Sequence, residues 1–117
     1  MKPLAVHHVS IAVSDVDAAL DFYTGVLGMT QRRDRPESLG DGAWLDVGGQ
    51  QLHLIRSTTP DPRGQHFAVL VADLDATTAE LRAAGVTVSD AVPIGASRQA
   101  FLSDPSGNSI ELHEAAR

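Results

Sequence analysis

The sequence predicts an α+β fold made of two copies of a βαβββ module. The first reason is an internal repeat, because residues 58 positions apart carry the same or similar side chains in both halves of the chain. The second is the order of hydrophobic periodicity, which runs strand, helix and three strands in each half. We expect modules at residues 4–56 and 65–114 within a single domain spanning residues 1–117. Identical pairs at this offset include Val13 and Val71, Asp15 and Asp73, Asp17 and Asp75, Ala18 and Ala76, and Gly49 and Gly107.

The first module begins with a strand and a helix. The run His7–Val13 alternates and is rich in β-branched residues, which is typical of a half-buried strand. The helix that follows is expected to have Ser14 as its N-cap and Gly28 as its C-terminal stop. Its apolar residues recur at spacings of four, three and four, so they form one stripe along the helix. The stripe consists of Val16, Leu20, Tyr23 and Leu27.

Three short strands complete the first module, around Met29–Arg33, Ala43–Val47 and Gln51–Arg56. The pair Gly48-Gly49 is expected to form the tight turn between the last two of them. Residues Asp34–Gly42 are polar and are expected to form an exposed loop.

The second module repeats this scheme. A strand is expected at His66–Val71, and the helix after it should begin at Asp73 and end at Gly85. The turn-forming residues Asp104–Asn108 should reverse the chain before the last strand. The three strands after the helix are expected near Val86–Ser89, Gln99–Leu102 and Ser109–His113. The linker between the modules is Ser57–Gln65, which contains two prolines.

Composition narrows the class of protein. The chain is 43% hydrophobic and 21% charged, as in ordinary globular domains. It has no cysteine, so any metal must be held by imidazole nitrogen and by oxygen. The net charge of -6 and the lack of a basic stripe argue against a nucleic-acid partner. The longest apolar run, Phe67–Ala72, is far shorter than a membrane span, so we expect a cytoplasmic protein with no membrane partner.

Four metal-ligand residue types occupy matching positions in the two modules. His8 and His53 are 45 residues apart, and so are His66 and Glu111. Strand alternation places all four on the face of their sheet that is not covered by the helix. We therefore predict that they converge on one divalent metal where the two modules meet. The neighbouring His7 and His113 are expected to face away or to lie at a strand end.

Three segments give the chain a resemblance to a known superfamily. They are HVSIAVSD at His8–Asp15, FYTGVLGM at Phe22–Met29 and DPSGNSIEL at Asp104–Leu112. With them the chain resembles the vicinal oxygen chelate superfamily, which includes glyoxalase I, bleomycin-resistance proteins, fosfomycin-modifying enzymes and extradiol dioxygenases. The resemblance covers essentially the whole chain. It implies a cup-shaped mixed sheet around one metal, with His8 and His66 as ligands.

The resemblance also assigns the remaining site residues. Glu111 matches the carboxylate ligand of the last strand, and His53 matches the fourth-strand position at which glyoxalase-like isomerases carry Glu and related epimerases carry Gln. Glu111 is then the one carboxylate among the four and the candidate catalytic base. The loop 91–99 lacks the lysine of the fosfomycin-modifying members, so the sequence argues against a fosfomycin-modifying enzyme. Candidate substrate-binding residues that line the cup are Ser10, Trp44, Gln51, Arg98, Gln99 and Phe101.

These residues favour a metal-dependent, glyoxalase-like lyase or isomerase acting on a small oxygen-bearing substrate. The metal would be Zn, Ni, Mn, Fe or Co, which three imidazoles and a carboxylate do not distinguish. If His53 is not a ligand, an Fe(II) extradiol-type dioxygenase becomes the better enzymatic interpretation. The non-enzymatic alternative is a drug-binding protein of the bleomycin- or fosfomycin-resistance type. We expect a homodimer, in which the ligands come either from one chain or from modules of two chains.

Overall fold

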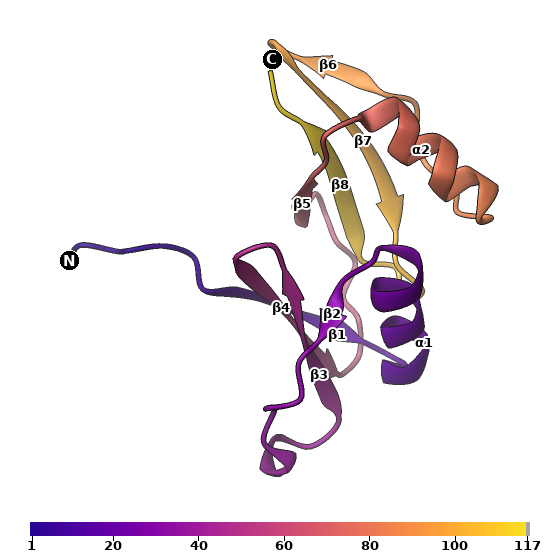
Figure 1. Ribbon diagram of the computed structural model, residues 1–117. Coiled ribbons are helices and arrows are strands. Elements are labelled where there is room, and N and C mark those ends of the chain that lie inside the picture. Colours follow the sequence, from indigo (N-terminus) through magenta and orange to yellow (C-terminus); the bar gives the residue numbers. More distant parts are fainter. Residues whose placement is uncertain (117) are drawn as a thin grey trace. The chain divides into compact units, whose positions relative to one another are not determined.

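The computed structural model describes residues 1–116 and contains two compact units. The first is Met1–Pro60, and the second begins at Asp61. Each unit contains one four-stranded mixed sheet and one main helical segment (Figure 1). This confirms the predicted α+β class. No helix among residues 1–116 has the length and the apolar character that crossing a membrane requires.

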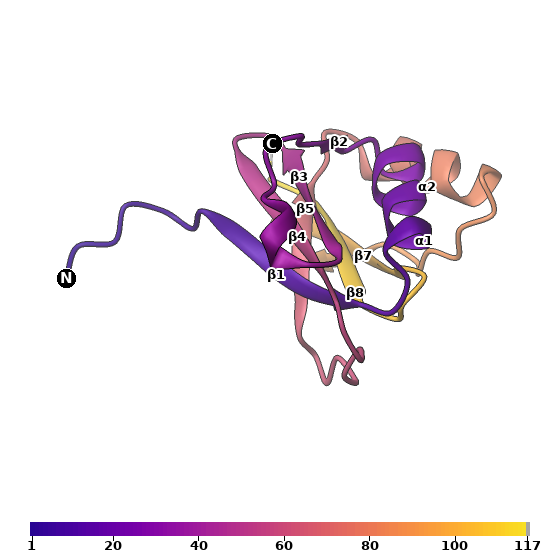
Figure 2. The ribbon, with the colours of Figure 1, turned by 90° about the horizontal axis from the view of Figure 1, so that it is seen from below.

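The sheet of the first unit has the strand order β1-β4-β3-β2. Strand β1 (His8–Val13) runs parallel to β4 (Gln50–Arg56). Strand β3 (Gly42–Val47) is antiparallel to β4 and to the two-residue strand β2 (Thr30–Gln31). Strand β4 therefore has a neighbour on both sides, with β1 beside it (Figure 2). Residues 1–7 lie outside the sheet as an exposed extended segment (Figures 1 and 2).

The helix of the first unit begins one residue later than predicted. Its N-cap is Asp15, whose carboxylate accepts a hydrogen bond from the Ala18 backbone N–H at 3.0 Å, so the expectation for Ser14 is wrong. The α-helical turn α1 (Val16–Leu20) continues as a π-helical turn, Asp21–Val26. The helix ends as predicted, because Gly28 follows the C-cap with a φ of 76° that L-residues rarely adopt.

The second unit has the same topology, with the strand order β5-β8-β7-β6. Strand β5 (His66–Leu70) runs parallel to the central strand β8 (Ser109–Glu114). Strand β7 (Ser97–Ser103) is antiparallel to β8 and to the edge strand β6 (Val92–Ile94). The helix α2 (Leu74–Ala83) has Asp73 as its N-cap, as predicted.

One strand prediction in the second unit is wrong. The segment Val86–Ser89 is not a strand, and the fourth strand of this sheet is β6. Val88 is buried, so the apolar pattern reflects packing of the chain after α2. Ser89 does bond to β7, because its backbone N–H donates to the Phe101 carbonyl and its hydroxyl accepts from the Phe101 N–H. A single residue pair does not make a ladder.

Each helix packs on one face of its own sheet. Helix α1 contacts β3 and β4, and α2 contacts β7 and β8. The loop between β2 and β3 contains a short 3-10 turn at Glu37–Leu39. The buried apolar side chains of the first unit include Val13, Ala19, Tyr23, Leu45, Leu52 and Leu54. Those of the second unit include Leu74, Leu81, Ala100, Leu102, Ile110 and Leu112.

Candidate functional site

The four predicted metal ligands lie as one pair in each unit. In the first, His8 on the edge strand β1 neighbours His53 on the central strand β4. In the second, His66 on β5 neighbours Glu111 on the central strand β8. The strands of each pair are adjacent and parallel, so side chains on the helix-free face come together across them. The face predicted from strand alternation is thus the face that each pair shares.

The two histidines of the first unit are stacked. The ring centroids of His8 and His53 are 3.9 Å apart and the ring planes differ by 12°. The indole of Trp44, directly opposite His53 on β3, stacks on the other side at 4.7 Å. Lone pairs lie in the ring plane, so two parallel imidazoles do not point at a common atom. Sharing a metal therefore requires the ring of the exposed His8 to turn.

His53 is held as a neutral imidazole. Burial lowers its pKa below the usual 6.5, and the positive charge of a protonated His8 lowers it further. The side chain is nearly buried, at 9% exposure, although it lies on the face opposite the core. Its Nε2 atom lies 2.9 Å from Oε1 of Gln51, two residues earlier on the same strand. A neutral imidazole keeps one ring lone pair, which is the form that binds metals.

The pair in the second unit has a different geometry. Nε2 of His66 lies 3.1 Å from Oε1 of Glu111. Nδ1 of His66 lies 2.9 Å from the carbonyl oxygen of Gly64, which fixes the orientation of the ring. The Glu111 side chain is 10% exposed. Phe101, opposite Glu111 on β7, packs its ring edge-on against the His66 ring at 5.2 Å.

The donor set of this pair fits a divalent cation. The Gly64 carbonyl can only accept, so Nδ1 of His66 must carry the proton. In the neutral ring, Nε2 then turns its lone pair toward Oε1 of Glu111. Two acceptors at this distance need a proton or a cation between them. Metal–ligand bonds of about 2.0–2.2 Å place neighbouring ligand atoms roughly 3 Å apart, as these two atoms are.

Each unit by itself brings two candidate ligands together and no more. Within residues 1–116, no three His, Asp or Glu side chains gather closely enough to hold a metal ion. The convergence of all four residues on one ion therefore stays a prediction.

The predicted substrate-binding residues divide into two groups. Five lie on the same face as the candidate ligands of their unit, and two of these, Trp44 and Phe101, are directly opposite His53 and Glu111. The other three are Ser10, Gln51 and Gln99.

Arg98 alone points the other way. Strand alternation puts it beside the core residues Ala100 and Leu102 on the helix-facing side of β7. There Arg98 bonds Asp75 at 2.8 Å and lies 3.9 Å from Glu114. The prediction that Arg98 lines the cup face is therefore corrected.

The sequence interpretation missed His113. Strand β8 extends to Glu114, so His113 lies inside the strand and on the same face as Glu111. Its Nδ1 atom is 2.9 Å from Oε2 of Glu111. Alternation along the strand is the signal that could have found it, because residues two apart share a face.

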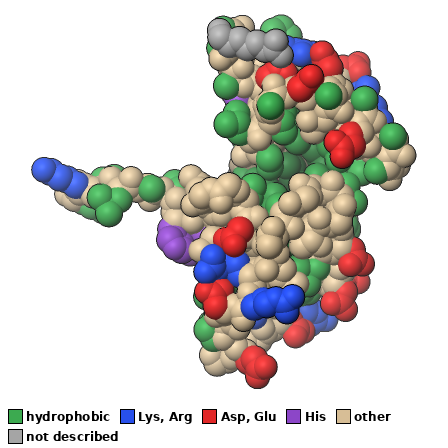
Figure 3. Space-filling model, in the orientation of Figure 1, with side chains coloured by type: hydrophobic (Ala, Val, Ile, Leu, Met, Phe, Trp, Pro, Cys, Tyr) green, Lys and Arg blue, Asp and Glu red, His purple; other side chains and the backbone are tan. Residues whose placement is uncertain are grey.

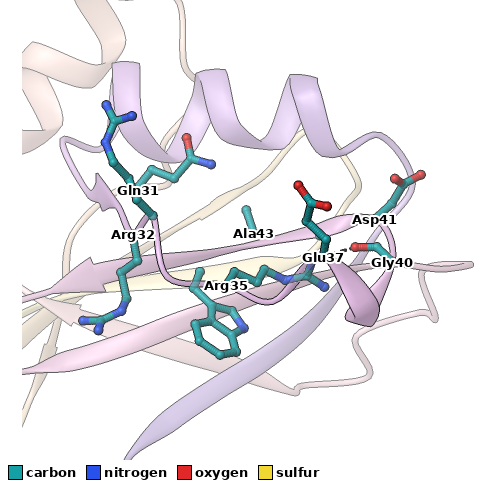
Figure 4. A pocket seen from close by; sticks show the side chains of 10 residues that line it. Gln31, Arg32, Arg35, Glu37, Gly40, Asp41 and Ala43 are labelled. Atoms are coloured by element: carbon teal, nitrogen blue, oxygen red, sulfur yellow. Dashed lines mark hydrogen bonds between the residues drawn. The ribbon is translucent and has the colours of Figure 1, made fainter.

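A pocket of about 530 Å³ lies within the loop that joins β2 to β3 (Figure 4). Its wall carries arginines and carboxylates together, and Figure 3 shows basic and acidic side chains beside one another on the first unit. Arg32 bonds Asp34 at 2.8 Å and Asp46 at 3.0 Å. Arg35 donates to the Gly40 carbonyl at 2.6 Å (Figure 4), and its guanidinium lies beside Gly42. These contacts brace the loop.

Comparison with known proteins finds a matching family model and several similar proteins. The family model of the Glyoxalase/Bleomycin resistance protein/Dioxygenase superfamily matches residues 5–112. The chain is 31% identical to Glyoxylase I 4 of Arabidopsis thaliana, over 92% of this chain and 69% of that protein. It is 32% identical to 2-epi-5-epi-valiolone epimerase of an Actinomyces species, over 93% and 78%. The solved structure of TnmS3, an antibiotic binding protein from Streptomyces sp. CB03234, is 31% identical with a TM-score of 0.85, covering 99% of both chains.

Proposed function

We propose that this chain, which belongs to the Glyoxalase/Bleomycin resistance protein/Dioxygenase superfamily, is a metal-dependent lyase or isomerase of the glyoxalase type. Its substrate would be a small molecule with two adjacent oxygen atoms. The observation that carries the proposal is the pair formed by His66 Nε2 and Glu111 Oε1, two potential metal-ligand atoms that face each other 3.1 Å apart. Relatives at about 30% identity that are named for such enzymes support it.

The ion would be held by His66 and Glu111 together with His8 and His53. These four would come from the two units of one chain or from two copies of the chain in a homodimer. When bound, the cation would polarise the adjacent oxygens of the substrate as a Lewis acid.

Glu111 is the side chain we propose as the general base. Once substrate displaces Glu111 from the cation, Oε1 would be free to take up a substrate proton, since Oε2 already accepts a hydrogen bond from His113. One base is sufficient for an isomerisation in which the proton removed from one carbon is returned to its neighbour. Trp44 and Phe101, each opposite a candidate ligand, would exclude water from the reacting atoms.

The test combines metal content with activity. Protein stripped with a chelator would be reloaded with each of Zn, Ni, Mn, Fe and Co, and its metal content measured by mass spectrometry. His66→Ala and Glu111→Ala should each lose the metal. Arg63→Ala, at an exposed residue of the second unit, is the control that should keep it. Loaded protein would then be assayed with hemithioacetals, with catechols, and with fosfomycin plus a thiol.

The oligomeric state is tested separately, by light scattering on the loaded protein. A dimer mass is expected. A monomer with full metal content would mean that one chain supplies all four ligands.

A second candidate function is sequestration of an aromatic drug. Two observations favour it: the likeness to an antibiotic binding protein along nearly the whole chain, and the row of stacked rings formed by His8, His53 and Trp44. Flat aromatic ligands stack on such rings. Tight binding of bleomycin-type or planar aromatic drugs to metal-free protein, with no turnover in any assay, would reject the enzyme and support this alternative.

A further inference from the structure

We propose that His113 is a positioning residue, which holds the Glu111 carboxylate in the orientation needed to bind a divalent cation. This inference rests on the proposed function, because the orientation of Glu111 matters only if Glu111 is a ligand.

The geometry assigns one imidazole to each oxygen of Glu111. Oε1 faces Nε2 of His66 at 3.1 Å, and Oε2 faces Nδ1 of His113 at 2.9 Å. His66 comes from the neighbouring strand β5, whereas His113 lies two residues further along β8 itself. Two contacts from different directions fix the rotation of the carboxylate about its own axis. Oε2 is then occupied, and Oε1 is left for the cation.

Burial makes the contact with His113 important. The Glu111 side chain is 10% exposed, and that of His113 is 32% exposed. Water therefore has limited access to replace the imidazole as a donor to Oε2. A buried carboxylate oxygen that loses its donor is unfavourable, so the carboxylate would turn to find another partner. Such a turn would move Oε1 away from His66.

The same arrangement occurs in the first unit with different residues. His53 also lies on a central strand, and its Nε2 atom is 2.9 Å from Oε1 of Gln51. Gln51 precedes His53 by two residues and so shares its face of β4. In each unit, the buried candidate ligand is thus held by a polar neighbour on its own strand. Outer hydrogen-bonding partners of this kind orient metal ligands, and losing one typically weakens metal binding about 10- to 100-fold.

The experiment is a calorimetric titration of chelator-treated full-length protein with Zn²⁺, at one fixed pH. His113→Asn keeps an N–H donor near the position of Nδ1 and should bind Zn²⁺ within about threefold of the unchanged protein. His113→Gln has a similar volume, but its amide reaches further and should miss Oε2. We expect it to weaken binding about 10- to 100-fold. Ser109→Ala is the matched control, because Ser109 lies two residues before Glu111 on the same face.

A titration with Co²⁺ adds a readout that a loss of folding would not mimic. If His113 only positions Glu111, the visible absorption bands of bound Co²⁺ should keep their wavelengths in His113→Gln while the affinity falls. A shifted band with no rescue by His113→Asn would mean that His113 is itself a ligand, and would overturn the proposal. Equal affinities for His113→Gln and Ser109→Ala would overturn it as well. If the unchanged protein binds neither ion, the proposed function fails first.

Discussion

Replacing Asp104 by alanine would test how strongly one turn fixes the strand that carries Glu111. Asp104 is 5% exposed and lies in the turn between β7 and β8. Its Oδ1 atom accepts hydrogen bonds from the backbone N–H groups of Ser106 and Asn108, each at 2.9 Å. Its Oδ2 atom accepts from the side-chain amide of Asn108, also at 2.9 Å. This carboxylate therefore adds three hydrogen bonds to the two backbone bonds that also close the turn.

The expected loss of stability follows from these three bonds. A hydrogen bond to a charged group contributes about 1.5–3 kcal/mol. The full sum is an overestimate, because bonds within one network are not additive and the freed N–H groups of the partly exposed Ser106 and Asn108 can bind water. We expect Asp104→Ala to lower the free energy of unfolding by about 2–4 kcal/mol. For a chain of this size, Tm should fall on the order of 10 °C.

Urea unfolding followed by circular dichroism is the assay, and two further variants make it decisive. Asp104→Asn keeps an acceptor at Oδ1 and loses the one at Oδ2, so it should lose about 1–2 kcal/mol. Asp90→Ala removes an exposed carboxylate of the same unit that lies 3.4 Å from Arg82, and should change stability by less than about 0.5 kcal/mol. If Asp104→Ala is no less stable than Asp90→Ala, the reasoning about the turn is refuted.

Three further predictions concern other parts of the chain. Gly42→Ala should lower the free energy of unfolding in urea by about 2–3 kcal/mol, because the added Cβ would lie against the backbone carbonyl oxygen of Leu54 and then against the Arg35 guanidinium; an Arg35→Ala background should restore little of the loss, and full relief there would contradict this. Burial lowers the pKa of His53 in the folded protein, so on acidification the unfolded chain is protonated at this residue first. The free energy of unfolding should keep the full contribution of His53 above about pH 6.5 and lose it as the pH falls below that value. In unfolding curves measured from pH 5 to 8, the free energy of unfolding of His53→Gln should depend less on pH. Glu114→Ala should lower the free energy of unfolding by about 1–2 kcal/mol, because the Glu114 carboxylate accepts a hydrogen bond from the Leu74 N–H at the start of α2 at 2.6 Å. Unchanged thermal unfolding of the variant would rule this out.

The repeat at offset 58 and the local patterns predicted the order of elements and, apart from the strand expected at Val86–Ser89, their positions to within a few residues. The repeat also contains information about the helix caps. Asp15 and Asp73 are a repeat pair, and both are N-caps in the structure. The local sequence favours Ser14 in the first module, because serine is a common cap and precedes the apolar stripe. The repeat would have corrected this, since its counterpart in the second module is not a cap.

The burial of the site residues could not be predicted from the sequence. Alternation places His53 and Glu111 opposite the core, which suggests exposure. Both are nearly buried because β4 and β8 are central strands, with side chains from the adjacent strands on either side. Which strand is central depends on the long-range parallel pairing of β1 with β4 and of β5 with β8. A local pattern does not contain that pairing.

Two errors at the candidate site came from strand ends and faces. The sequence pattern ends the last strand at His113, whereas β8 continues to Glu114. The pattern also predicts a loop before Gln99, which leaves Arg98 free to reach the substrate-binding face. Once β7 begins at Ser97, alternation with the buried Ala100 puts Arg98 on the helix side. Boundary errors of a few residues thus changed the strand face and the position assigned to these two side chains.

The two units differ where the repeat changes its offset. Trp44 and His53 are nine positions apart, whereas Phe101 and Glu111 are ten apart, because two residues lie between the last paired residues of the first hairpin and five between those of the second. At a constant offset of 58, Trp44 would pair with the buried Leu102, and the match with Phe101 would be missed. The register of the antiparallel pairing shifts to accommodate this difference, so each unit still has an aromatic ring opposite the candidate ligand on its central strand.

The chemical difference between the units bears on the substrate. The first unit offers two imidazoles, of which His53 is kept neutral by burial, while the second offers His66 and the carboxylate of Glu111. If these four residues hold one divalent cation, they neutralise a single unit of its charge. The remaining positive charge would favour a substrate oxygen that is itself negative, or that becomes negative as a proton moves to Glu111. That balance suits proton transfer next to a carbonyl group, which is the reaction class proposed here.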